Sequence, residues 1–99
     1  MRVDYLAGRA EVLNSVAALT VDTDGPEAGL AVFRESLDVA RSAEHPLEVA
    51  HALAGMARCE IRLGQRGAGV EHLREAVDLY RRMGSVEYAA TAAFLRDSI

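Results

Sequence analysis

The chain has 99 residues, a formal net charge of −4 and a hydrophobic fraction of 51%. This length suits a single domain with a modest core, and the hydrophobic fraction excludes a disordered chain. The negative charge disfavours binding to nucleic acid or to an anionic membrane surface, because both need clustered cationic side chains. We therefore expect a small folded domain that contacts neither nucleic acid nor membrane directly.

Two features bear on the cellular compartment. No stretch has the pattern of a signal peptide, and no apolar run approaches the ~18 residues of a membrane span. The single cysteine, Cys59, cannot form a disulfide within the chain, which fits a reducing compartment. It is either a small buried hydrophobe or, with Arg58 and Arg62 nearby, a reactive thiol. We expect a cytoplasmic protein.

Apolar residues recur at helical spacing in five consecutive segments, and no segment alternates as a strand does. Asp24 is expected to cap the second helix, with Glu27 three residues later as in a capping box. Pro26 and Pro46 suit first helical turns, and Gly84 suits the end of the fourth helix. The predicted helices cover residues 3–20, 26–43, 46–63, 68–83 and 86–97.

One side of each of the first four helices is predicted to be buried, because its apolar residues fall three or four positions apart. Short connections between the helices imply antiparallel neighbours. The predicted inward residues are Leu6, Ala10, Leu13, Val16, Ala17 and Thr20, then Leu30, Phe33, Leu37 and Ala40, then Val49, Ala50, Leu53, Met56, Ala57 and Cys59 or Glu60, then Val70, Leu73, Ala76, Val77 and Tyr80.

The stretch "GLAVFRESLDVAR" at 29–41 returns as "GVEHLREAVDLYR" at 69–81, forty residues later. Identities at the same shift also fall on the preceding helices, such as Ala17 with Ala57. A mid-helix glycine costs roughly 1 kcal/mol relative to alanine, so Gly29 and Gly69 need a packing reason. We expect these small residues to mark two equivalent helix crossings. The alternative is two unrelated amphipathic helices that share an Ala-rich composition.

The stretch "LAGMARCEIRLGQRGAGVEHLREAV", residues 53–77, resembles a tetratricopeptide repeat. Gly at 29 and 69 replaces the usual Ala, and the period is forty where thirty-four is usual. The ending "LYRRMGS" is similar to lengthened repeats in bacterial signalling ATPases and large transcriptional activators. The positions that carry the resemblance are Leu53, Met56, Ala57, Gly64, Gly69, Leu73 and Ala76.

The resemblance implies an all-α fold in which antiparallel helix-turn-helix repeats form a short right-handed solenoid of about five helices. The repeats would span about 3–43 and 46–84, with an extra or capping helix at about 86–98. A solenoid of this kind presents an extended concave surface for binding.

No metal-binding, phosphate-binding or nucleophile motif occurs, so we expect no enzyme, no cofactor and no metal site. The resemblance instead implies a bacterial interaction module that binds a protein or peptide in the groove lined by the first helix of each repeat. Thr91, Phe94 and Leu95 would continue this groove on the fifth helix. The predicted groove residues are Glu11, Asn14, Ser15, Ala18, His51, Ala54, Gly55, Arg58 and Arg62.

A second interpretation is a stand-alone adaptor that self-associates. The fifth helix would leave an apolar surface at the end of the array, and such surfaces commonly mark interfaces. A homodimer would then form through Tyr88, Ala92, Phe94 and Leu95.

Overall fold

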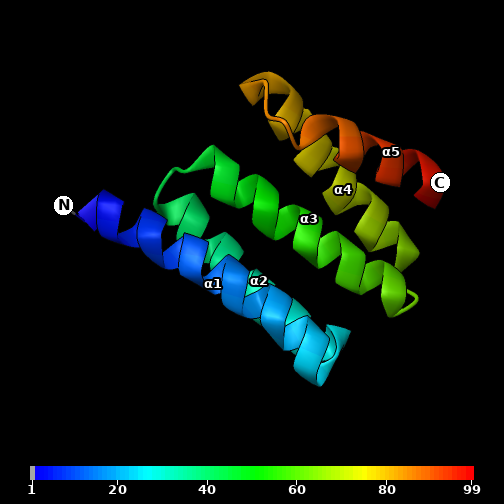
Figure 1. The fold of residues 1–99 in the computed structure, drawn as a ribbon, viewed down its shortest axis with the longest axis horizontal. Helices are drawn as coiled ribbons and strands as arrows, with labels where there is room; N and C mark the ends of the chain where they lie inside the picture. The colour runs from blue at the N-terminus through cyan, green and yellow to red at the C-terminus, as the bar shows by residue number, and fades with distance from the viewer. Residues whose placement is uncertain (1) are drawn as a thin grey trace.

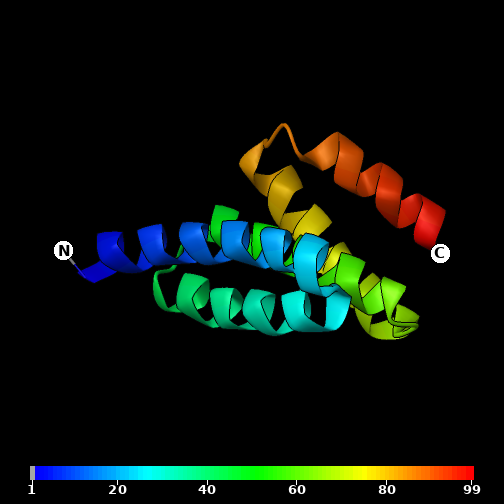
Figure 2. The same ribbon diagram turned by 60° about the horizontal axis from the view of Figure 1, so that its bottom comes forward.

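The computed structural model describes residues 2–99, with side chains from Tyr5 onward. Helices α1 and α3 lie side by side, α2 lies behind α1, and α5 packs on α4 at the other end of the molecule (Figures 1 and 2). No strand occurs in the described part of the chain, so the predicted all-α fold of five helices is confirmed. The helices are α1 (Arg2–Asp24), α2 (Pro26–Ser42), α3 (Pro46–Arg62), α4 (Arg66–Met83) and α5 (Tyr88–Ser98).

The helices pack as successive neighbours. α1 pairs with α2 and α3 pairs with α4, while α2 also packs against α3 and α5 packs on α4. The central helix α3 carries most of the core, because helices on either side cover it. Leu53 on α3 and Leu73 on α4 are both fully buried, and Phe33 on α2 is 7% exposed. The core therefore lies between α2, α3 and α4.

The two predicted helix crossings are confirmed. A Cβ added at Gly29 would lie 3.2 Å from the carbonyl oxygen of Ala17, and one added at Gly69 would lie 3.0 Å from that of Ala57. Because the two distances nearly match, α1 crosses α2 as α3 crosses α4. The packing between paired helices therefore repeats with the same forty-residue period as the sequence.

The end of the first helix differs from the prediction. α1 continues past Thr20 to Asp24, so Asp24 ends this helix and does not cap the next one. Gly25, with φ of 98°, is the N-cap of α2 and is the single residue that connects α1 to α2. Val21 holds the extra helical turn in place, because its side chain packs directly over Gly29 of α2.

Two other helix starts also differ from the prediction. α4 begins at Arg66, two residues before the predicted start, and α5 begins at Tyr88, two residues after it. Gly84 ends α4 in the left-handed conformation, with φ of 64°, as predicted. The Ser85 hydroxyl then accepts a hydrogen bond from the Glu87 N–H at 3.1 Å. This bond stabilises a turn over residues 85–87, and α5 begins after the turn.

Val16 was predicted to face inward, but it is 44% exposed. Its neighbours Ala10 and Ala17, which are fully buried, form the inner side of α1. α1 is the first helix of the array, and within residues 2–99 no other helix lies over its outer side. Val16 is therefore on an apolar face that this chain leaves uncovered.

A polar groove as candidate functional site

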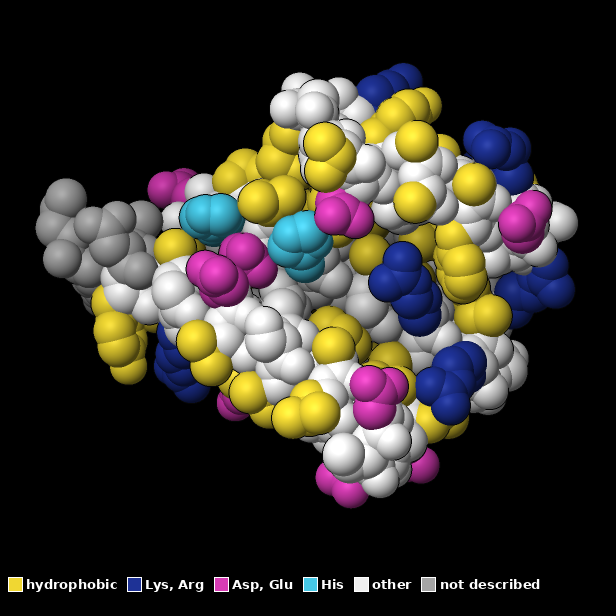
Figure 3. All heavy atoms as spheres, viewed as in Figure 1, with side chains coloured by type: hydrophobic (Ala, Val, Ile, Leu, Met, Phe, Trp, Pro, Cys, Tyr) yellow, Lys and Arg dark blue, Asp and Glu magenta, His cyan; other side chains and the backbone are white. Residues whose placement is uncertain are grey.

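A groove of about 740 Å³ opens on the face formed by α1, α3 and α5 (Figure 3). Arg62 lines a neighbouring hollow of about 270 Å³, which shares Ala18, Gly55 and Arg58 with the groove. Eight of the nine predicted groove residues line the larger groove: Glu11, Asn14, Ser15, Ala18, His51, Ala54, Gly55 and Arg58.

Small residues on α3 make the floor of the groove. A Cβ added at Gly55 would overlap the aromatic ring of Phe33, which reaches the floor from α2. Ala54 beside it is 4% exposed. The floor is therefore apolar and closely packed, and the polar groups stand on the walls.

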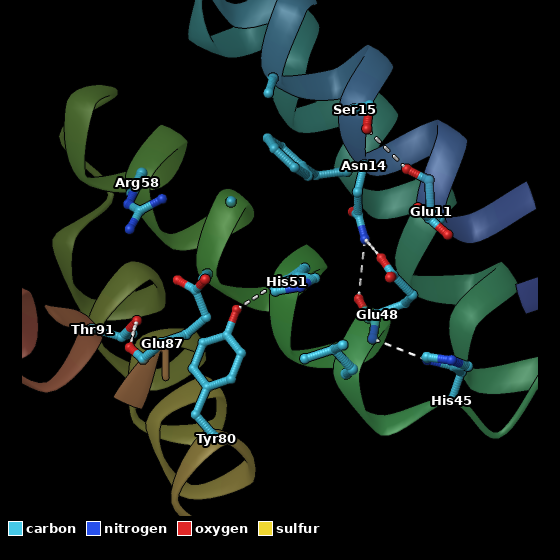
Figure 4. A pocket seen from close by; sticks show the side chains of 15 residues that line it. Glu11, Asn14, Ser15, His45, Glu48, His51, Arg58, Tyr80, Glu87 and Thr91 are labelled. Atoms are coloured by element: carbon cyan, nitrogen blue, oxygen red, sulfur yellow. Dashed lines mark hydrogen bonds between the residues drawn. The ribbon is translucent and has the colours of Figure 1, made fainter. Parts of the chain in front are cut away.

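One wall is fixed by Asn14 of α1. Its Nδ2 donates to the Glu48 carboxylate Oε1 at 2.9 Å and to the Glu48 carbonyl oxygen at 3.2 Å (Figure 4). The Glu48 N–H donates to His45 Nδ1 at 3.4 Å, so His45 caps the start of α3. The Oδ1 atom of Asn14 is buried and has no hydrogen-bond partner within the described residues. These bonds tie α1 to the start of α3 and orient two polar side chains at the groove.

The opposite wall is fixed by Tyr80 of α4. Its hydroxyl lies 2.5 Å from Nδ1 of His51, and the two side chains point toward each other in Figure 4. Burial, with a smaller contribution from the charge of nearby Glu87, raises the pKa of Tyr80 to about 12. The phenol thus stays protonated at neutral pH and can donate to a neutral His51 ring.

Acidic and basic side chains are unevenly distributed around the groove. Acidic and histidine side chains gather along one half of the hollow, and arginine side chains stand mainly along the other half, where an acidic side chain adjoins one of them (Figure 3). Arg58 extends over the ring of Phe94, with its guanidinium carbon 5.6 Å from the ring centroid, a cation–π distance that links α3 to α5. The groove lining includes Glu11, Glu48, Glu87 and Arg58, and the neighbouring hollow adds Asp22 and Arg62.

The lining includes polar residues that the sequence prediction missed: His45, Glu48, Tyr80 and Glu87. Tyr80 was assigned to the core, where its ring does lie, but its hydroxyl reaches the groove. Glu87 comes from the turn before α5, whose direction depends on the Gly84 bend. Glu48 lies three residues before His51 and seven before Gly55, and this helical spacing on the groove side of α3 is the signal that could have indicated it.

The residues predicted on the fifth helix lie on two sides of α5. Thr91 lines the groove and donates from its hydroxyl to the Glu87 carbonyl at 2.8 Å, and Phe94 lies under Arg58. Leu95 and Tyr88 instead line a separate hollow over α4, with Arg74, Val77, Asp78 and Arg81. The structure thus brings Thr91 to the groove, places Phe94 against Arg58 and Leu95 elsewhere, and divides the set predicted for self-association.

Other kinds of site have less support in the described residues. No cluster of His, Cys, Asp and Glu there could hold a metal ion. No helix of residues 2–99 is long and apolar enough to cross a membrane. Cys59 is 2% exposed, and burial raises the pKa of its thiol, which favours its interpretation as a buried hydrophobe.

Comparisons of the chain with protein-family models, curated proteins and solved structures found no match. The candidate site therefore rests on its own geometry.

Proposed function

We propose that the chain is a protein-interaction module and that its groove binds an extended segment of a partner protein. The observation that carries this proposal is the fixing of both groove walls by hydrogen bonds between helices, Asn14 to Glu48 and Tyr80 to His51. Polar groups oriented before a ligand arrives lower the entropy cost of binding. The volume of about 740 Å³ also lies in the range of roughly 300–1,000 Å³ that is usual for ligand sites.

The uneven distribution of charge suggests the chemistry of the segment. Basic side chains of the partner would lie toward Glu11 and Glu87, and acidic side chains would lie toward Arg58, because Arg62 shares its separate hollow with Asp22. The side chains of Glu11, Glu87 and Arg58 are exposed, so they can meet a ligand without a change of fold. Charge complementarity of this kind mainly sets specificity and association rate. We therefore propose that the partner segment carries both acidic and basic side chains and is not a purely apolar helix.

The likeness of the sequence to tetratricopeptide repeats supports the same proposal, because repeats of that family bind partners on the face lined by their first helices. Its likeness to the lengthened repeats of bacterial regulators supports a role in signalling or transcriptional control. In such a protein the module would recruit or position another chain, and it would perform no chemistry itself.

The proposal can be tested without knowing the partner. Random twelve-residue peptides displayed on phage would be selected against the immobilised chain, and selected peptides would be titrated by fluorescence anisotropy. Arg58→Ala should weaken peptide binding at least tenfold, because Arg58 is an exposed groove cation whose loss disturbs little of the core. Asn14→Ala is unsuitable for this test, because Asn14 also holds the buried Glu48.

Arg34→Ala is the matched control. Arg34 is an exposed arginine on α2, outside the groove lining, and its loss changes the net charge by the same amount. Peptide affinity should be unchanged in this variant, and both variants should melt near the wild-type temperature by circular dichroism. Equal affinity for Arg58→Ala and Arg34→Ala, or failure to select any peptide, would contradict the proposed function.

A further inference from the structure

The hollow of about 270 Å³ beside the groove has a mostly apolar lining that comes from three helices. Phe33 of α2 and Cys59 of α3 are 7% and 2% exposed, so these buried residues form its bottom together with Gly55. Ala18 and Val21 line it from α1. We call this space the anchor hollow. Its polar groups are confined to the exposed residues around its mouth.

Two small residues keep the anchor hollow open and connect it to the groove. A Cβ added at Gly55 would overlap the ring of Phe33, so only glycine at this position lets the ring reach the hollow. Ala18 is exposed on α1 and adds no more than a methyl group to the lining. Both residues also line the groove, so the two cavities adjoin there. A segment lying in the groove therefore passes beside the mouth of the anchor hollow.

The charged residues of the lining carry an excess of positive charge. Arg58 and Arg62 lie one helical turn apart on α3, and Asp22 of α1 is the acidic residue of the lining. All three are exposed, which places their charges at the mouth and leaves the bottom apolar. Because Arg58 also lines the groove, an acidic group of the bound segment can meet it without entering the hollow.

The size of the anchor hollow suits one side chain. Its volume of about 270 Å³ is below the range of roughly 300–1,000 Å³ that is usual for whole small-molecule sites. Side chains that fill closed apolar pockets supply most of the binding energy at protein interfaces. A charged side chain would lose its hydration at this bottom and find no partner there. The occupant that fits is therefore a large apolar side chain.

We infer that the anchor hollow takes one leucine, methionine or phenylalanine side chain of the partner segment, and that an acidic residue next to this anchor contacts Arg58. The inference rests on the proposed function, because the anchor belongs to the segment that lies in the groove. It adds the feature of the partner sequence that the chain recognises: a large apolar residue adjoining an acidic one.

Peptides selected against the immobilised chain provide the first test. An alanine scan of a selected peptide, followed by fluorescence anisotropy, should identify one large apolar position whose replacement weakens binding at least tenfold. Replacing the adjacent acidic residue should cost less, and this loss should disappear in Arg58→Ala. Nuclear Overhauser effects from the anchor should reach Val21 and Cys59, which line the anchor hollow and not the groove.

Ala18→Leu tests the same contact from the side of the chain, because a leucine at this exposed position would extend into the anchor hollow. In this variant, replacing the peptide anchor by alanine should weaken binding at most about twofold, because the two changes are coupled. Ala31→Leu is the matched control, since Ala31 is an exposed alanine on α2 outside the lining of both cavities. The anchor should keep its full effect there, and both variants should melt near the wild-type temperature.

The possible outcomes separate this inference from the proposed function. Peptides that bind and depend on Arg58, yet tolerate alanine at every large apolar position, would overturn the inference and leave the proposed function intact. Equal anchor effects in the wild type and in Ala18→Leu would overturn it too, as would Overhauser effects from the anchor to residues outside the hollow. Failure to select any peptide would contradict the proposed function, and the inference with it.

Discussion

The hydroxyl of Tyr80 lies 2.5 Å from Nδ1 of His51, and this contact joins the second layer of helices to the wall of the groove. Tyr80 is 2% exposed, so its ring belongs to the core while its oxygen belongs to the candidate site. Stability and site geometry are therefore coupled at this residue. A change that removes the phenolic proton should affect both.

The free energy of unfolding should fall as the pH rises from about 10 to about 12. The folded pKa of Tyr80 is raised to about 12 from an unfolded value of about 10, so the folded state holds this proton more tightly. The stabilisation is complete below pH 10 and is lost as the pH rises through the folded pKa. It amounts to at most about 2–3 kcal/mol. Urea unfolding at a series of alkaline pH values measures it.

Tyr80→Phe is the control for the alkaline prediction, because it keeps the ring and removes the titrating group. The variant should lose the portion of the alkaline decrease that Tyr80 causes. An identical pH dependence in the wild type and in Tyr80→Phe would show that another group is responsible.

Asn14→Ala should destabilise the fold by about 1–3 kcal/mol. The substitution removes two hydrogen bonds to Glu48, whose side chain is buried at 7% exposure and would lose a donor. Ser15→Ala next to it should change stability little, because Ser15 is exposed and bonds only to the Glu11 carbonyl of its own helix. Chemical unfolding of both variants measures the difference. Equal effects would mean that the Asn14 bridge contributes nothing.

The pair formed by Glu60 and His72 should show energetic coupling. Glu60 is 2% exposed, and its Oε1 lies 2.7 Å from Nδ1 of His72. Removing one partner leaves a buried polar group without its bond, so Glu60→Gln and His72→Gln should not be additive. A double-mutant cycle at neutral pH should give a coupling of about 0.5–3 kcal/mol. Simple additivity of the two substitutions would contradict this expectation.

Gly69→Ala should destabilise the fold although alanine favours helices. The new Cβ would lie 2.7 Å from Ile61 Cγ1 and 3.0 Å from the Ala57 carbonyl oxygen, and the overpacking costs about 1–3 kcal/mol. Gly67→Ala, two residues earlier in α4, meets nothing within 4 Å and should leave stability unchanged or slightly higher. Thermal unfolding compares the two. Equal melting temperatures would exclude the proposed role of Gly69 at the crossing.

Some features could be predicted from the sequence because they depend on the spacing of residues along the chain. Five helices follow from apolar spacing, and the close crossing at Gly29 follows from a glycine that recurs at Gly69. Most groove residues could be placed in the same way, since positions forty residues apart have equivalent surroundings. Arg58 is one such residue, and it lies in the groove as the register implied.

Other features depend on contacts between elements and could not be predicted from spacing. α1 extends to Asp24 because Val21 packs across the turn, which the polar sequence around it does not indicate. Val16 is exposed because apolar spacing identifies a face but does not say whether a helix covers it. Glu87 reaches the groove through the bend at Gly84, whose direction is set by packing.

The most direct test of the groove as the binding site is a map of backbone amide shifts in the nuclear magnetic resonance spectrum. The isotopically labelled chain would be titrated with a selected peptide. We predict that the largest shifts will gather at groove residues such as Glu11, His51, Arg58 and Thr91. Shifts concentrated on the exposed apolar residues Tyr5, Val12, Val16 and Leu19 of α1, or on the outward sides of α2 and α4, would contradict the account.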